Sequence, residues 1–262
     1  MKLLFVGDVV GKPGRRILAE ELPRLIDRYE IDYVVVNVEN AAGGFGVNHE
    51  VWAELAALPI DCFTSGNHVW DKKEVHDLLV REPRLLRPAN YPDGNPGRGV
   101  HVGATAAGVP VAVLHLQGCV FMAPLASPFE TADRLLAGLG PEVKVILVDF
   151  HAEATSEKQA LGFYLDGRVS AVVGTHTHVP TGDERVLPGG TGFLTDVGMT
   201  GPYESVIGMR ADKVVQRFLL QTHVPFEVAK RDVRLAAAVV DVDETTGRAR
   251  AVERLLVPAG AG

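Results

Sequence analysis

The stretch that decides the fold is Arg168-Val-Ser-Ala-Val-Val-Gly174, followed at once by Thr175-His-Thr-His178. The first seven residues are rich in β-branched side chains and end in glycine, which predicts a short buried strand. In an extended backbone, residues two apart point to the same side. We therefore expect His176 and His178 to lie side by side at a strand end, an arrangement that suits metal ligation. The alternative is two unrelated loop histidines.

Other strand-like segments end in the same way. Segments 2–7, 31–38, 60–65 and 143–150 are apolar and rich in valine, leucine and isoleucine. Segment 168–174 is the fifth of this kind. The polar side chains that end or follow the five segments are Asp8, Glu39, Asn40, Asn67, His68, His151, His176 and His178. In open α/β sheets, ligands bind outside the carboxyl ends of the strands. We therefore expect these polar groups to converge on one site.

The ligand types indicate which metals the site would take. Carboxylate, imidazole and amide oxygen suit Mn, Fe, Zn or Co, and no thiolate is among the candidates. Eight candidate groups exceed the three or four that one catalytic ion takes from protein, so two ions joined by a bridging carboxylate fit better. Two-metal sites serve in-line displacement at phosphorus, where a shared water loses a proton and becomes the nucleophile.

The rest of the chain alternates strands with helices, which predicts an α/β fold. A Gly/Pro loop at 9–14 precedes a helix that ends near Tyr29, and further helices are expected at 49–58, 72–80, 129–138, 155–165 and 210–217. Asp71 and Glu74 resemble a capping box for the third helix, and Thr155 or Ser156 would cap the fifth. Strands are expected at 100–106, 110–116, 184–187 and 192–195, with a terminal hairpin at 233–242 and 248–257. Without a repeat or linker, residues 1–262 are expected to form a single domain.

Composition narrows the functional class. The net charge is −7, and no block of basic residues offers a footprint for long nucleic acid. Two cysteines without CxxC spacing favour a reduced, cytoplasmic protein, with Cys62 in the core. No apolar run reaches the length of about 18 residues that a membrane span needs.

A glycine-rich loop, Ala41-Ala-Gly-Gly-Phe-Gly46, follows the second strand. Such a loop lets backbone N–H groups approach an anion, which makes Gly43, Gly44 and Phe45 candidate substrate contacts. A mobile surface loop is the alternative. Asp183, Asp196 and Asp212 are interpreted as loop or cap residues.

The polar residues at the ends of the five strand-like segments together resemble the signature of calcineurin-like metallophosphoesterases. Gly66-Asn67-His68 and Gly174-Thr-His-Thr-His178 are the clearest matches. Val10 stands where that signature has a metal-binding histidine, and Val38-Glu39-Asn40 replaces Gly-Asp. These departures are similar to those of the YmdB-like bacterial phosphodiesterases. Gly7-Asp-Val-Val-Gly11 and Asp149-Phe-His-Ala-Glu-Ala-Thr-Ser-Glu-Lys158 also look like that family.

The resemblance implies a four-layer α/β/β/α sandwich with mixed sheets and with metals, Fe and/or Mn, at the C-terminal ends of the strands. Glu39 would bridge two ions; Asp8, Asn40 and His178 would complete one site, and Asn67, His151 and His176 the other. His68 would protonate the leaving oxygen as general acid. Glu153 would orient a ligand histidine or simply begin a helix in solvent.

The implied activity is hydrolysis of 2′,3′- and/or 3′,5′-cyclic nucleoside monophosphates. A phosphomonoesterase or an RNA-end nuclease is the second hypothesis. The third is a nucleotide-responsive regulatory protein that uses its metals structurally. A homo-oligomer is compatible with the resemblance.

Overall fold

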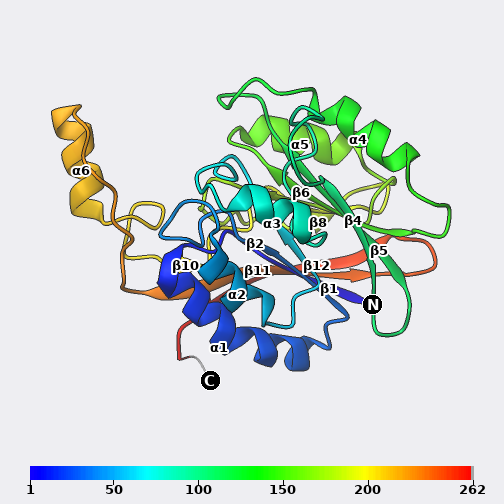
Figure 1. Ribbon diagram of the computed structural model, residues 1–262. Coiled ribbons are helices and arrows are strands. Elements are labelled where there is room, and N and C mark those ends of the chain that lie inside the picture. Colours follow the sequence, from blue (N-terminus) through cyan, green and yellow to red (C-terminus); the bar gives the residue numbers. More distant parts are fainter. Residues whose placement is uncertain (261–262) are drawn as a thin grey trace.

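A computed structural model describes residues 1–260 of the chain (Figure 1). The helices are α1 Gly11–Tyr29, α2 His49–Ala56, α3 Val75–Arg81, α4 Pro128–Ala137, α5 Thr155–Tyr164 and α6 Ala211–Leu220. The first strands are β1 Lys2–Val6, β2 Tyr33–Asn37, β3 Cys62–Thr64, β4 Val100–Ala104, β5 Pro110–Gln117 and β6 Val145–His151. The remaining strands are β7 Ala171–Thr175, β8 Arg185–Val186, β9 Gly192–Leu194, β10 Gly201–Pro202, β11 Val233–Val242 and β12 Ala249–Pro258.

The strands form two mixed sheets. In the first, β1, β2 and β3 are parallel, β11 runs antiparallel to β1, and β10 and β12 both pair with β11. In the second, β5, β6, β7 and β9 are parallel, while β4 and β8 are antiparallel edge strands. The expected hairpin of residues 100–116 is therefore the edge of the second sheet, and the terminal hairpin extends the first.

Three apolar cores separate four layers. Helices α1, α2 and α3 pack on the outer face of the first sheet, as Leu22 and Trp52 show. The two sheets face each other across a second core that contains Phe5 and Leu147. Helices α4 and α5 cover the outer face of the second sheet, with Leu161 in that third core. This confirms the expected α/β/β/α layering.

Several local expectations were wrong, each because a tertiary contact or backbone geometry prevailed. Helix α1 begins at Gly11, inside the expected loop, because Pro13 is tolerated in a first helical turn. The N-cap of α3 is Glu74, without a side-chain capping bond among the described residues. Helix α5 is preceded by Ala154, again without such a bond in residues 1–260, so neither Thr155 nor Ser156 caps it.

Helix α6 is the element that lies farthest from this sandwich. It extends from one side of the body at the end of an arm (Figure 1). The arm consists of α6 and the two segments that flank it, residues 203–210 and 221–232, which are bridged at Met209 and Val228. Within residues 1–260, each helix is too short or too polar to cross a lipid bilayer.

Candidate metal centre

The polar side chains expected to converge do so where strand ends of both sheets meet. Asp8 follows β1, Glu39 and Asn40 follow β2, and Asn67 and His68 follow β3. His151 is the last residue of β6, and His176 and His178 follow β7. All eight expected residues thus lie at the C-terminal edge of the sandwich.

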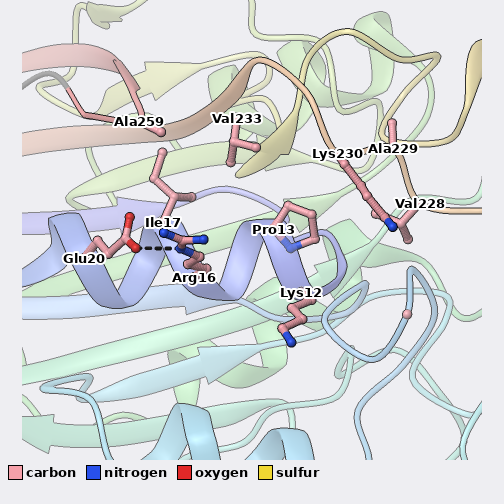
Figure 2. Close-up of a pocket in the computed structure, with 11 residues that line it drawn as sticks. Lys12, Pro13, Arg16, Ile17, Glu20, Val228, Ala229, Lys230, Val233 and Ala259 are labelled. Carbon is pink, nitrogen blue, oxygen red and sulfur yellow. Dashed lines mark hydrogen bonds and ion pairs between the residues drawn. The ribbon is translucent and has the colours of Figure 1, made fainter.

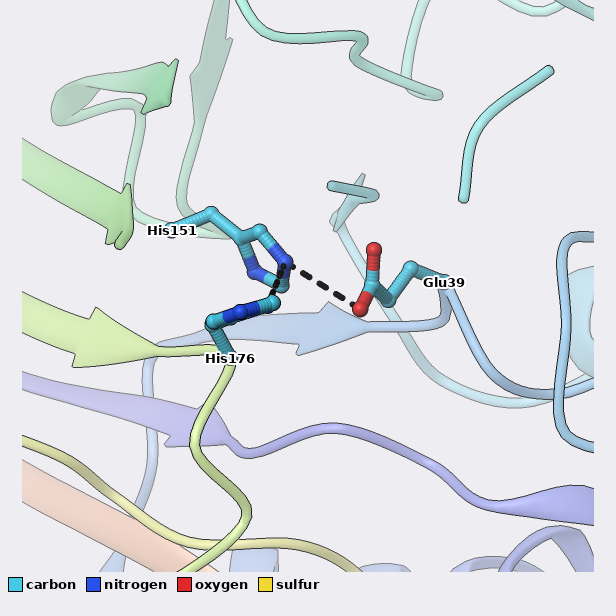
Figure 3. Close-up of side chains that lie close together, drawn as sticks. All are labelled: Glu39, His151 and His176. Atoms are coloured by element: carbon cyan, nitrogen blue, oxygen red, sulfur yellow. Dashed lines mark hydrogen bonds and ion pairs between the residues drawn. The ribbon is translucent and has the colours of Figure 1, made fainter. Parts of the chain in front are cut away.

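One group of ligand atoms surrounds His151. Its Nε2 atom lies 3.1 Å from Glu39 Oε1, 3.0 Å from Asn67 Oδ1 and 3.1 Å from His176 Nδ1. Figure 3 shows the carboxylate and the two imidazoles facing one another. A single N–H cannot be donated to three acceptors at once. Two ligand atoms about 2.1 Å from one ion and at right angles are about 3 Å apart, so the spacing fits a shared cation.

A second group joins Asp8, Glu39 and His178, whose ligand atoms lie within 4.8 Å of one another. His178 Nε2 is also 3.1 Å from Asn40 Oδ1. Asp8 Oδ1 is buried and accepts no hydrogen bond from residues 1–260. A buried carboxylate oxygen without a donor is costly unless a cation compensates it. Glu39 belongs to both groups.

Hydrogen bonds fix which atoms face the cluster. His178 Nδ1 donates to the Ile207 carbonyl at 2.9 Å, which leaves Nε2 with its lone pair toward Asp8 and Asn40. The Asn40 side-chain N–H group donates to the Gly44 carbonyl at 2.9 Å, so its Oδ1 faces inward. Both side chains are therefore oriented toward the cluster by hydrogen bonds within the chain itself.

A buried chain of hydrogen bonds orients His151. Its Nδ1 donates to Thr175 Oγ1 at 2.9 Å, and Thr175 donates to Asp149 Oδ1 at 2.7 Å. Asp149 Oδ2 accepts from the Asn37 side chain at 3.1 Å. Partners behind a ligand histidine set its tautomer and its basicity. They leave His151 Nε2 for the cluster.

The charges at the centre favour a cation. Burial opposes ionisation of Glu39, but His151 and His68 lower its pKa to about 2. Burial would lower the pKa of His151, but Glu39 and Asp8 raise it to about 9. Burial raises the pKa of Asp8 to about 6. The cluster thus stabilises positive charge between its carboxylates, which a metal ion would supply in place of a proton.

The backbone at Gly66 also fits a crowded ligand cluster. A Cβ atom at this position would collide with Glu39 Oε2 and with His151 Nε2. Only glycine lets the chain pass this close, so the residue before Asn67 is constrained by the cluster.

His68 lies beside the cluster and belongs to neither ligand group. Its Nδ1 is 2.8 Å from Asp71 Oδ2, and its backbone N–H donates to Glu39 Oε2 at 3.2 Å. The Phe45 ring meets the imidazole edge-on, with centroids 5.0 Å apart. Asp71 therefore orients His68 and does not cap α3 as the sequence suggested.

The glycine-rich loop has a structural task that its composition did not reveal. The backbone N–H groups of residues 42–46 donate to carbonyls within residues 39–46. Gly43, Gly44 and Gly46 have positive φ, which this tight turn requires. The loop supports Glu39 and Asn40, and among Gly43, Gly44 and Phe45 the aromatic ring is the group that lies against His68.

The His176–His178 segment is not an extended strand end. His176 has φ 97° and His178 has φ 66°, so the backbone turns and each histidine joins a different ligand group. The turn is fixed by Asp196, which is 1% exposed and accepts from Thr177 Oγ1 at 2.7 Å and from Lys158 Nζ at 2.6 Å.

Sequence reasoning missed this support. The sequence indicates only a loop or cap residue at Asp196, and Lys158 stands out only as the last residue of a family motif. The available signal was a lysine on an otherwise apolar helix face. Glu153, left open between two roles, has Oε2 at 3.1 Å from His176 Nε2 and so orients that imidazole.

A family model described as YmdB-like protein matches residues 4–255 of the chain. The chain belongs to the YmdB-like family. A Bacillus subtilis member named 2′,3′-cyclic-nucleotide 2′-phosphodiesterase is 48% identical over 257 residues, which cover 98% of this chain and 97% of the relative. The expected family is therefore confirmed.

Two solved structures share the fold of this YmdB-like chain. A hypothetical protein from Thermus thermophilus has a TM-score of 0.92 at 43% identity, covering 98% of this chain and 99% of its own. A structure described as a novel phosphatase of Mycoplasma pneumoniae has a TM-score of 0.92 at 33% identity, covering 98% of this chain and 93% of its own. The layered arrangement of this chain is thus shared with both solved structures.

Proposed function

We propose that this chain is a dimetal phosphodiesterase that hydrolyses cyclic nucleotides, with 2′,3′-cyclic nucleoside monophosphates as the first candidates and 3′,5′-cyclic monophosphates as the second. The observation that carries the proposal is the place of Glu39 in two ligand groups at once. The names of the relatives confirm the coarser expectation, a hydrolase of phosphoric esters. The 2′,3′-cyclic class is taken from the name of the Bacillus subtilis relative.

The ligand assignment is the one that the family resemblance implies, and the distances within the two groups support it. Glu39 would bridge two ions; Asn67, His151 and His176 would complete one set, and Asp8, Asn40 and His178 the other. Imidazole, carboxylate and amide oxygen together suit Mn, Fe, Zn or Co, and among these the family resemblance favours iron and manganese. When bound, the two ions would lower the pKa of a water and neutralise charge on the phosphoryl oxygens.

His68 would act as the general acid. Asp71 accepts from its Nδ1, so Nε2 is the ring nitrogen that can give a proton to the leaving ribose oxygen. The Phe45 ring packs edge-on against the same imidazole. Because His68 is outside both ligand groups, its role can be separated experimentally from metal binding.

The test pairs His68→Gln with a matched control, His76→Gln, which changes an exposed histidine on α3. We expect His68→Gln to lower kcat about 10²–10⁴-fold, as loss of a general acid does, with metal content unchanged by elemental analysis. His76→Gln should leave both unchanged. Loss of metal from the His68 variant would contradict the assigned role.

A substrate panel distinguishes the alternatives. It contains 2′,3′-cyclic AMP, 3′,5′-cyclic AMP, a phosphomonoester and a short RNA, each given to the Mn-loaded protein. The description of the Mycoplasma pneumoniae structure as a phosphatase favours the monoester as second candidate. Preference for the monoester or RNA would keep the metal chemistry and replace the substrate. Full metal content without any turnover would favour the regulatory hypothesis.

A further inference from the structure

The loop that joins β5 to α4, residues 118–127, is apolar almost throughout. Its sequence is Gly-Cys-Val-Phe-Met-Ala-Pro-Leu-Ala-Ser. At its tip, Phe121 is 89% exposed and Val120 is 42% exposed. Single apolar residues are common on protein surfaces, so this exposure does not by itself indicate a site.

The backbone of Phe121 is the second unusual feature of the loop. The Met122 N–H donates to the Cys119 carbonyl at 3.3 Å and closes a tight turn with Val120 and Phe121 at its centre. Phe121 has φ 61°, a value that glycine or asparagine usually supplies at this position of a turn. A bulky residue with this backbone is strained, and such residues gather at ligand-binding sites. The turn thus exposes an aromatic ring although its backbone disfavours one.

Hydrogen bonds on both sides of the tip hold this loop in place. The Glu157 carboxylate accepts from the backbone N–H groups of Cys119 and Val120 at 2.9 and 3.2 Å. Farther along, the Asn90 side chain donates to the Ala126 carbonyl at 3.0 Å. The exposed ring is therefore carried by an anchored turn, which suits a contact with a ligand.

The anchored loop begins beside the candidate metal centre. Gln117 pairs with His151 in the parallel ladder, and the Gly118 N–H donates to the His151 carbonyl at 3.0 Å. Phe121 is three residues farther along, so its Cα atom lies within about 11 Å of the Gly118 Cα atom. A nucleotide whose phosphate is held at His151 would therefore have its nucleoside within reach of the Phe121 ring.

Another apolar surface is a groove of about 580 Å³ between α1 and residues 228–230 (Figure 2). Ile17, Val233 and Ala259 line this groove together with Lys12 and Lys230. Among the described residues that line it, none belongs to the eight that converge on the metal centre. The turn of Phe121, by contrast, is continuous with a strand that is hydrogen-bonded to His151. It is therefore the better candidate for a contact with the substrate.

We propose that Phe121 is the platform on which the nucleobase of the substrate stacks, next to the metal centre. This inference rests on the proposed function, because the nucleotide is the one that the centre would hydrolyse. Every base has an aromatic face, so stacking accepts all four bases and favours the larger purines. Residues 118–126 carry no side-chain amide, carboxylate or hydroxyl that can read the edge of a base. This subsite thus recognises the face of a base and not its edge.

The first experiment measures binding and needs no turnover. Isothermal titration calorimetry of the Mn-loaded protein compares adenosine 3′-monophosphate with inorganic phosphate. We expect Phe121→Ala to weaken nucleotide binding about 5–150-fold, as loss of one stacked base does, and to leave phosphate binding unchanged. Phe121→Trp should retain the affinity. The matched control Phe163→Ala, which truncates an α5 side chain that is 55% exposed, should bind both ligands like the unchanged protein.

Three results would overturn the proposal. The first is equal affinity of the unchanged protein for the nucleotide and for phosphate. The second is a Phe121→Ala variant that binds the nucleotide as tightly as the unchanged protein does. The third is a change of mass in that variant, measured by light scattering, with unaltered nucleotide affinity, because the ring would then contact another copy of the chain.

Thermal unfolding separates a binding role of the ring from a structural one. Phe121→Gly removes both the ring and the backbone strain, so its melting temperature should not fall. Its affinity for adenosine 3′-monophosphate should fall as in Phe121→Ala. A melting temperature several degrees lower would show that the ring supports the fold, which contradicts the proposal.

The second experiment measures turnover of the 2′,3′-cyclic forms of AMP, GMP and CMP. We expect the unchanged protein to have lower KM values for the two purine nucleotides, with little difference between them. Phe121→Ala should raise all three KM values and leave kcat largely unchanged, because stacking is retained throughout the reaction. A difference of more than about tenfold between AMP and GMP would show that the edge of the base is read, against the proposal.

The outcomes distinguish this contact from the proposed activity. Nucleotide binding that depends on Phe121, without turnover of any cyclic nucleotide, would support the contact and refute the activity. Turnover of cyclic nucleotides with the same KM in Phe121→Ala would refute the contact and leave the activity.

Discussion

The two ends of the second sheet share one alternation of side chains but differ in chemistry. In the first halves of β5, β6 and β7, the side chains that face the other sheet are Val111, Val113, Val145, Leu147, Ala171 and Val173. In the last residues of the same strands, the positions with the same period are His115, Gln117, Asp149, His151 and Thr175. Both sets are fully buried. Burial alone therefore does not distinguish the core from the site.

The difference shows where the chain gives up stability for a function. The apolar end gains from every buried methylene. At the polar end, both side-chain polar atoms of Gln117 and Nε2 of His115 have no hydrogen-bond partner among residues 1–260. Such groups cost stability unless something compensates them. We interpret the apolar end of the sheet as the part that stabilises the fold. We interpret the polar end as the part that orients the side chains of the candidate metal centre.

The largest effect on stability is expected at the ion pair that holds the His176–His178 turn. Lys158→Met leaves Asp196 buried and without its cation, which should lower the free energy of unfolding by about 3–5 kcal/mol. Urea unfolding followed by circular dichroism measures this. The control Lys144→Met removes an exposed lysine and should change stability by less than about 0.5 kcal/mol. Equal effects of the two substitutions would show that the pair is dispensable.

The apolar end is tested by Leu147→Ala. This residue is fully buried between the sheets, so its truncation should cost about 2–5 kcal/mol of stability. Because Leu147 lies four residues before His151, metal content and turnover should be retained while the protein is folded. A variant that stays fully stable, or that loses metal while folded, would contradict the division of the sheet into two ends.

The polar end is tested by Thr175→Val, which removes the hydroxyl between His151 and Asp149. We expect metal affinity to fall about 10–100-fold, as it does when a partner behind a ligand is lost. Competition with a chromogenic chelator measures it. Thr191→Val is the matched control, because this buried hydroxyl donates to the Val169 carbonyl at 2.7 Å away from the cluster. It should lower stability and leave metal affinity unchanged.

The sequence predicted those features of the fold and of the candidate site that depend on the local pattern of apolar and polar residues. Runs of β-branched residues located the parallel strands, and the polar residues at their ends located the site. The layering followed from the family resemblance. These inferences succeed because strand period and strand direction place Asp8, Glu39 and His151 at one edge, whatever the rest of the chain does.

The parts that failed depend on partners far away in the sequence. The positive φ at His176 is imposed by Asp196 and Lys158, and the Ile207 carbonyl that orients His178 comes from the arm. Asp71 had the spacing of a helix cap, yet its carboxylate turns to His68. Propensity describes a residue in isolation, whereas each of these side chains is placed by a tertiary hydrogen bond.

The smallest effect is expected from a titratable group on β3 of the first sheet, Cys62, which lies in the apolar core between the two sheets. Burial raises the pKa of the Cys62 thiol in the folded protein, whereas in the unfolded chain the pKa of a cysteine thiol is about 8.5. Above that pH the unfolded state gains from losing a proton and the native state does not, so stability should fall as pH rises. Between pH 8 and 9.5 this thiol should lower the free energy of unfolding by about 1 kcal/mol.

Urea unfolding at the two pH values should show this difference in the unchanged protein and a smaller one in Cys62→Ala. The same pH dependence in both proteins would show that Cys62 ionises in the folded state as it does in the unfolded chain.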